Sequence, residues 1–158
     1  MGDLEGKVAI VTGAGTGIGR GIATVLARHG ATVVCTDLSR ETAAATAGLI
    51  AERGGRATGV AHNVTDWDST HAVVADALKA HGQIDILVTN AGVSKSVPFH
   101  ELDVAEWNRV NDVNIKGVFI SCRAVIPHMI SRKYGKIVNI SSMVGKEGIP
   151  LFVHYCAS

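Results

Sequence analysis

The fold is decided by the glycine-rich stretch Thr12-Gly13-Ala14-Gly15-Thr16-Gly17-Ile18-Gly19, which lies between a β-branched run and an Ala-rich segment. A loop between a strand and a helix offers a phosphate group backbone N–H donors and the positive end of a helix dipole. Gly13 permits the tight turn, Gly17 lets the backbone approach a pyrophosphate, and Gly19 lets the helix pack closely on the sheet. The spacing is G-x-x-x-G-x-G rather than the strict G-x-G-x-x-G, because Ile18 occupies the last glycine slot. A merely flexible turn is therefore an alternative.

Outward from this loop, short β-branched runs alternate with longer Ala-rich segments. The pattern predicts strands at Val8–Thr12, Thr32–Thr36, Ala57–Ala61, Ile84–Thr89 and Lys136–Ile140, and helices at Gly17–His29, Glu41–Arg53, Asp68–His81 and Ala105–Arg132. Asp66 or Thr65 is placed to cap the third helix. Gly30, Gly54 and Gly82 follow helices and suit a left-handed terminal position. We expect one α/β domain over residues 1–158, with a doubly wound parallel sheet between two layers of helices.

Composition and charge exclude several classes of protein. The 158 residues are 47% hydrophobic and 18% charged, and the net charge of +1 gives no basic footprint for nucleic acid. The seven His are scattered, which predicts no metal site, and three distant Cys are typical of free thiols in a reducing compartment. The start of the chain is polar, and no apolar run approaches the roughly 20 residues of a membrane span. We expect a cytoplasmic protein with no membrane partner.

An acidic residue after the second predicted strand indicates which dinucleotide the glycine-rich loop would bind. Asp37 follows Gly13 by 24 positions. A carboxylate there can accept both hydroxyls of an adenosine ribose and would repel a 2′-phosphate, so NAD is expected and NADP is disfavoured. Leu38 and Thr16 supply no cation for that phosphate, although Arg40 could if its side chain folded back. A capping or turn role is the alternative for Asp37.

The loop, joined to Asn90-Ala91-Gly92, Asn114, Ser141-Ser142 and Tyr155, resembles the short-chain dehydrogenase/reductase family. The resemblance covers the whole chain in unbroken order. It implies a Rossmann fold in three α/β/α layers, a nicotinamide cofactor, and the interconversion of an alcohol and a ketone or aldehyde by hydride transfer.

The resemblance also implies the catalytic residues. Tyr155 would be the general acid in reduction and the base in oxidation, and Ser142, 13 positions earlier, would donate to the substrate oxygen. Asn114 matches the residue whose backbone holds a water in the proton relay, with a polar residue at a helix kink as the alternative. A phenol loses its proton only at a pH of about 10, so it needs a nearby cation, which in the family is a Lys four residues after the Tyr.

The cofactor and substrate sites are assigned in the same way. Asn63-Val64 stands where the family more often has Asp-Val against the adenine, and an amide can still bind the exocyclic amine. Asn90-Ala91-Gly92 either lies along the cofactor or ties strand ends together. The expected cofactor set is Gly13, Gly15, Thr16, Gly17, Ile18, Gly19, Asp37, Leu38, Asn63, Val64, Asn90, Ala91, Gly92 and Tyr155. The expected near wall of the substrate site is Val93-Ser94-Lys95, Met143-Val144-Gly145 and His154.

The sequence runs Tyr155-Cys156-Ala157-Ser158, so the position of the family Lys is not part of it. We expect the natural chain to continue with that Lys, further strands and the loop that selects the substrate, and to form a homodimer or homotetramer. We do not expect residues 1–158 alone to be a competent enzyme. A non-catalytic module that binds a dinucleotide is the second hypothesis, although the presence of both Ser142 and Tyr155 counts against it. A scaffolding role is third.

Overall fold

A computed structural model describes residues 2–158 and contains one parallel five-stranded sheet in the order β3-β2-β1-β4-β5. The strands are β1 (Val8–Thr12), β2 (Thr32–Asp37), β3 (Arg56–Ala61), β4 (Ile86–Thr89) and β5 (Lys136–Asn139). In the centre of the sheet Ile10 aligns with Val34 on one side and with Leu87 on the other. The chain order reverses direction between β1 and β4, and the loops at this point meet at the carboxyl edge.

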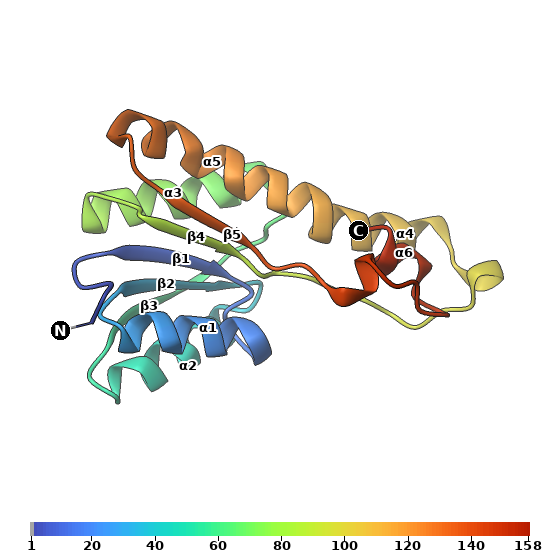
Figure 1. The fold of residues 1–158 in the computed structure, drawn as a ribbon, viewed down its shortest axis with the longest axis horizontal. Coiled ribbons are helices and arrows are strands. Elements are labelled where there is room, and N and C mark those ends of the chain that lie inside the picture. Colours follow the sequence, from blue (N-terminus) through green and yellow to red (C-terminus); the bar gives the residue numbers. More distant parts are fainter. Residues whose placement is uncertain (1) are drawn as a thin grey trace.

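Helices cover both faces of the sheet, so the predicted doubly wound fold is confirmed (Figure 1). α1 (Gly17–Arg28) and α2 (Arg40–Ala51) lie on one face, and α3 (Trp67–His81) and α5 (Gly117–Arg132) on the other. Short elements extend beyond the carboxyl edge. They are η1 (Phe99–Glu101), α4 (Val104–Asn111), η3 (Met143–Gly145) and α6 (Val153–Cys156), and a π-helical turn, η2 (Asp112–Lys116), joins α4 to α5.

The core consists of two apolar layers, one on each face of the sheet. Every residue of β1 and β4 is buried, as expected for inner parallel strands. Successive side chains of a strand point to opposite faces, so Val11 packs towards Ala23 of α1 whereas Ile10 packs towards Val125 of α5. β5 lies at the edge of the sheet, and all four of its residues are exposed.

The helix ends follow the capping signals in the sequence. Oδ1 of Asp66 accepts from the backbone N–H of Ser69 at 2.6 Å, which caps α3. Gly30, Gly54 and Gly82 have φ values of 99°, 77° and 73°, in the left-handed region that glycine enters without strain. These predictions are confirmed.

Several predicted elements differ from the structure by one or two residues at their ends, and two differences have a clear structural cause. The helix predicted over Ala105–Arg132 is divided into α4, η2 and α5 by the π-helical turn, whose extra residue changes the helical phase. The strand predicted from Ile84 begins at Ile86, because the N–H of Ile84 donates to Nε2 of His128 at 3.2 Å and is not part of the ladder.

The stretch Val104–Arg132 is, by length and composition alone, a helix that could cross a membrane. In the structure its second half, α5, packs against α3 and β4. Ile120, Val125 and Met129 are buried there. The apolar side chains on that side of the helix therefore form part of the core.

A buried histidine beneath the sheet predicts acid sensitivity. His62 is 5% exposed, and its ring contacts the hydroxyls of Thr36 at 2.9 Å and Thr70 at 3.0 Å. Burial lowers the pKa of His62 from 6.5 to about 4. Between pH 6.5 and about 4, His62 is therefore protonated in the unfolded chain but neutral in the folded protein. The free energy of unfolding decreases as the pH falls through this range. The difference of about 2.5 pKa units between the unfolded and the folded state corresponds to about 3 kcal/mol in the free energy of unfolding.

Urea unfolding between pH 4 and 7.5 checks this expectation. His62→Gln should be less stable than the parent at pH 7. Between pH 7 and pH 4 its free energy of unfolding should fall by about 3 kcal/mol less than that of the parent. His100→Gln, at a side chain that is 82% exposed, should retain the full pH dependence. An identical pH dependence in His62→Gln and the parent would contradict the assignment.

Candidate active site

A cavity of about 640 Å³ lies at the carboxyl ends of β1, β2, β4 and β5. It brings together the glycine-rich loop after β1, Asp37 at the end of β2, the turn after β4 and the segment after β5. Tyr155 of α6 lies on the same cavity. Five segments that are distant in sequence therefore meet at the place where open parallel α/β sheets bind their ligands.

The glycine-rich loop has the geometry of a phosphate cradle. Gly13 and Gly17 have φ values of 63° and 53°. A Cβ at Gly19 would overlap the Gly13 carbonyl oxygen and come within 2.5 Å of Nδ2 of Asn90, so only glycine allows this approach. At Gly17 no atom of residues 2–158 lies within 4 Å of an added Cβ, and this residue lines the cavity. The loop is therefore closely packed on the side of the sheet and open on the side of the cavity, which fits a pyrophosphate at the start of α1.

Asp37 is placed both to support the loop and to meet a ligand. Its Oδ2 accepts from the N–H of Gly15 at 3.0 Å, and its Oδ1 accepts from the N–H of Ser39 at 3.3 Å. Arg20 of α1 donates to the Gly15 carbonyl and, at 3.1 Å, to Oγ1 of Thr46 in α2. The Arg20 guanidinium is thus bound to Gly15 and Thr46 and does not line the cavity, whereas Asp37 does.

Asn90 ties the turn after β4 to the end of β1. Its Nδ2 donates to the carbonyls of Thr12 at 3.0 Å and Gly13 at 3.2 Å. The Thr12 hydroxyl in turn accepts from the backbone N–H groups of Asn90 and Ala91, both at 3.0 Å. The structural reading of Asn90 is confirmed, and because Asn90, Ala91 and Gly92 also line the cavity, the two readings are compatible.

Asn114 connects the π-helical turn to two other walls of the cavity. Its Oδ1 accepts from the N–H of Val93 at 2.9 Å, and its Nδ2 donates to the Val93 carbonyl at 3.0 Å and to Oγ of Ser158 at 2.8 Å. π-helical turns occur frequently at functional sites. Asn114 therefore lies at a helix irregularity and on the cavity at once.

Ser142 and Tyr155 line the same cavity from different elements. Ser142 caps η3 by accepting from the N–H of Val144 at 3.3 Å. The ring of Tyr155 makes an edge contact with Phe152, with 6.4 Å between centroids.

Some predicted site residues lie elsewhere. Val93, Ser94 and Gly145 line the cavity, but Leu38, Asn63, Val64, Gly15, Lys95, Met143 and Val144 are not in its lining. Oδ1 of Asn63 accepts from the N–H and hydroxyl of Thr65, and Val64 is buried against Gly117. The expectation that His154 lines the cavity is wrong, because its side chain is 0% exposed and faces α4.

The structure adds cavity residues that sequence reasoning missed, among them Val118, Asn139 and Ser158. Asn139 ends β5, and its Oδ1 accepts from the Thr89 hydroxyl at 2.7 Å. Its place at a strand terminus was a signal that could have revealed it. Val118 carries no such signal, because its orientation depends on the phase of α5 after the π-helical turn.

Residues 2–158 contain no group of three His, Cys, Asp or Glu side chains that could hold a metal ion. The three cysteines are free, and burial raises the pKa of the Cys35 thiol to about 12, which makes it a structural residue at neutral pH.

Comparison with known proteins agrees with this geometry. Residues 7–158 match the family model described as short chain dehydrogenase. The chain is 39% identical over 155 residues to 3-oxoacyl-(acyl-carrier-protein) reductase FabG of Thermotoga maritima, covering 98% of this chain and 63% of the relative. It is 46% identical to Oxidoreductase UcpA of Salmonella typhimurium (92% and 55% covered) and 41% identical to D-threitol dehydrogenase of Mycolicibacterium smegmatis (98% and 60% covered).

A solved structure from Sinorhizobium meliloti, described as that of a short-chain alcohol dehydrogenase, superimposes with a TM-score of 0.94 at 40% identity. The match covers 99% of this chain and 62% of that one. The chain thus spans less than two thirds of the length of these relatives. The family model, the relatives and the shared fold together show that this chain belongs to the short-chain dehydrogenase family.

Proposed function

We propose that the protein is an NAD(H)-dependent oxidoreductase that interconverts an alcohol and a ketone or aldehyde. The observation that carries the proposal is the single cavity on which the glycine-rich loop, Asp37, Ser142 and Tyr155 all lie. A site that only binds a dinucleotide needs the first two of these features. Ser142 and Tyr155 add a proton donor and a proton acceptor at the far end, as carbonyl chemistry requires.

The nucleotide end of the cavity would hold the cofactor through the backbone N–H groups of residues 13–19, with the adenosine ribose at Asp37. Asn90, Ala91 and Gly92 line the same cavity and are proposed to lie along the cofactor, and Leu38, Asn63 and Val64 are proposed for the adenine end. The nicotinamide ring, when bound, supplies or accepts the hydride.

At the reacting end Ser142 donates a hydrogen bond to the substrate oxygen, where negative charge grows during reduction. Tyr155 gives its phenolic proton to that oxygen in reduction and takes it back in oxidation. The side chain of Asn114 is engaged with Val93 and Ser158. Its backbone carbonyl is proposed to hold a water of the proton relay, by analogy with the family.

The substrate is proposed only as a class. The relatives named above are a 3-oxoacyl reductase and a threitol dehydrogenase, so they share a carbinol or carbonyl carbon and little else. We further propose a cytoplasmic homodimer or homotetramer, by analogy with the family.

Cofactor preference is the first prediction of the proposal. Asp37→Asn retains an oxygen that can accept from the N–H of Gly15 but removes the charge that opposes a 2′-phosphate. The parent should bind NADH at least about tenfold more tightly than NADPH, and Asp37→Asn should lower this ratio of affinities by about tenfold. Titration of nicotinamide fluorescence measures the dissociation constants of NADH and NADPH. Asp76→Asn, an exposed position on α3, should leave the ratio unchanged. Equal affinities in the parent would overturn the NAD assignment.

Turnover tests the reaction itself. The natural protein should oxidise NADH in the presence of members of a panel of small ketones and aldehydes, and Ser142→Ala should slow this by about 10²-fold or more, as removal of an oxyanion donor does. Tight NADH binding with no turnover across the panel would favour the non-catalytic module instead.

A further inference from the structure

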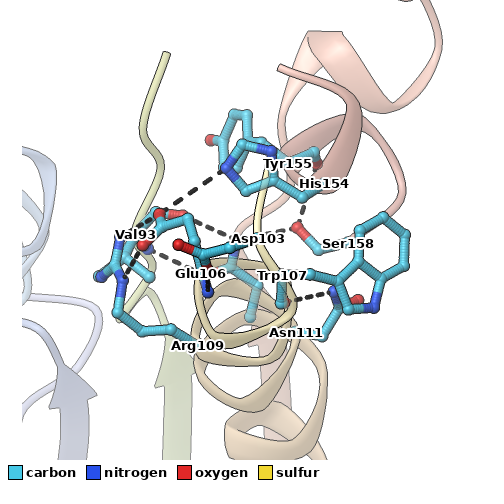
Figure 2. Close-up of polar contacts among 10 residues, drawn as sticks. Val93, Asp103, Glu106, Trp107, Arg109, Asn111, His154, Tyr155 and Ser158 are labelled. Carbon is cyan, nitrogen blue, oxygen red and sulfur yellow. Dashed lines mark hydrogen bonds and ion pairs between the residues drawn. The ribbon is translucent and has the colours of Figure 1, made fainter. Parts of the chain in front are cut away.

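His154 is the one residue of α6 that is fully buried. Its neighbour Tyr155 lines the cavity, whereas the His154 side chain is 0% exposed and points towards α4 (Figure 2). Consecutive residues of a helix are separated by about 100° around its axis, so one four-residue helix presents these two side chains in different directions. Because both side chains belong to one helix, the packing of His154 against α4 also bears on the orientation of Tyr155.

The partner of His154 is the carboxylate of Glu106 in α4. Nε2 of His154 lies 3.8 Å from Oε1 of Glu106, whose side chain is only 13% exposed. Neither ring nitrogen has a hydrogen-bond partner among the described residues. An apolar side chain would fill such a site without the cost of burying two polar atoms. An imidazole that faces a carboxylate instead places a polar contact between α6 and α4.

Glu106 is itself held in place. Arg109 donates to both carboxylate oxygens, at 2.9 and 2.8 Å, and Oδ1 of Asp103 accepts from the backbone N–H of Glu106 at 2.7 Å. The hydrogen bonds from Arg109 are the main reason that the pKa of Glu106 is lowered, and the charges of Lys95 and His154 act in the same direction. His154 therefore faces an oriented, ionised carboxylate.

A second contact fixes the other end of the same segment. Oγ of Ser158 accepts from Nδ2 of Asn114 at 2.8 Å and donates to the Tyr155 carbonyl at 3.0 Å. Tyr155 thus lies between two attachments, one to α4 through His154 and one to the π-helical turn through Ser158.

We infer that His154 and Glu106 form a positioning pair, which fixes the orientation of α6 on α4 and so places the Tyr155 hydroxyl for proton transfer. This role rests on the proposed function of Tyr155. Neither His154 nor Glu106 lines the cavity that the glycine-rich loop and Asp37 share. Loss of the pair should therefore lower turnover without weakening NADH binding, because a small misplacement of a reacting group reduces the rate steeply.

The test uses the natural full chain with His154→Leu, Glu106→Gln and the double variant. Each single change should lower kcat by about tenfold or more, with the dissociation constant of NADH within about twofold of the parent. The double variant should be no worse than the poorer single variant, because both changes remove one contact. The matched control is His100→Leu, which removes the exposed pair of His100 and Glu101 at 3.6 Å and should leave kcat unchanged.

Amide hydrogen exchange gives a readout that does not need turnover. The N–H groups of Cys156 and Ala157, which donate to Phe152 and Val153 within α6, should exchange faster in both single variants. A kcat within twofold of the parent in His154→Leu, or NADH affinity that falls in parallel with kcat, would overturn the inference. If His154→Leu does not fold, Glu106→Gln decides by the same criteria. Failure of the proposed function is distinct, because Tyr155→Phe would then turn over as the parent does.

Discussion

Tyr155→Phe should lower kcat for carbonyl reduction by about 10²–10⁴-fold, the usual contribution of a general acid. The substitution removes one oxygen and leaves a ring of the same shape. The edge contact with Phe152 can persist, and the backbone bonds of α6 do not involve the hydroxyl. NADH affinity should stay within about threefold, because the glycine-rich loop and Asp37 are unchanged. Steady-state kinetics with NADH and fluorescence titration measure the two quantities on one preparation.

The second tyrosine of the chain provides the control. Tyr134 lies between α5 and β5, at the opposite end of the strands from the cavity, where Lys7 sits 4.2 Å from its ring centroid. Tyr134→Phe also deletes one hydroxyl and should leave kcat within twofold. If Tyr155→Phe retains a comparable rate, Tyr155 is not the proton donor, and the catalytic part of the proposal is wrong.

Gly19→Ala should destabilise the fold by about 1–3 kcal/mol and weaken NADH binding by at least about tenfold. The added methyl group meets backbone, the Gly13 carbonyl, and the Asn90 amide at 2.5 Å. Backbone cannot rotate away as a side chain can, so either α1 moves from the sheet or the loop changes shape. Both outcomes displace the N–H groups that face the cavity. Urea unfolding and NADH titration report the two effects separately.

Gly21, two residues further along α1, is the matched position. It is exposed, and no described atom lies within 4 Å of a Cβ built there. Gly21→Ala should therefore stabilise the protein by about 0.5–1 kcal/mol through helix propensity, with unchanged NADH affinity. Equal effects of the two substitutions would show that Gly19 is not in close contact with the loop.

Much of the fold could be predicted because its signals are local. The inner strands β1 and β4 are apolar runs, and Asp66 and Gly82 cap α3 at the positions where capping requires them. The π-helical turn could not be predicted in this way. It depends on one extra residue between two regular helices, and no residue type in 112–116 marks that change. The position of Asn114 was visible from the sequence, whereas the hydrogen bonds that hold it depend on where Val93 and Ser158 come to lie.

The residues of the candidate site could be predicted where they come directly after a strand. They were harder to predict where they belong to a short helix. The carboxyl edge of a parallel sheet gathers whatever follows each strand, so Asp37, Asn90 and Ser142 could be grouped in advance. The side of α6 that faces the cavity depends on its packing against α4, and His154 was therefore placed on the wrong side. Asp37 was predicted as a ligand of ribose, but its bond to the N–H of Gly15 required the folded loop.

The position of β1 has a consequence for how this chain comes to be folded. β1 is synthesised before β2 and β4, yet it lies between them in the sheet. Translation proceeds at about 5–20 residues per second, so the edge of β1 that will meet Ile86–Thr89 stays unpaired for on the order of several seconds. During that interval a largely apolar strand offers its free hydrogen-bonding edge to any other nascent chain. Newly made protein should therefore depend on chaperones that shield extended apolar segments, and its yield should fall when synthesis outpaces them.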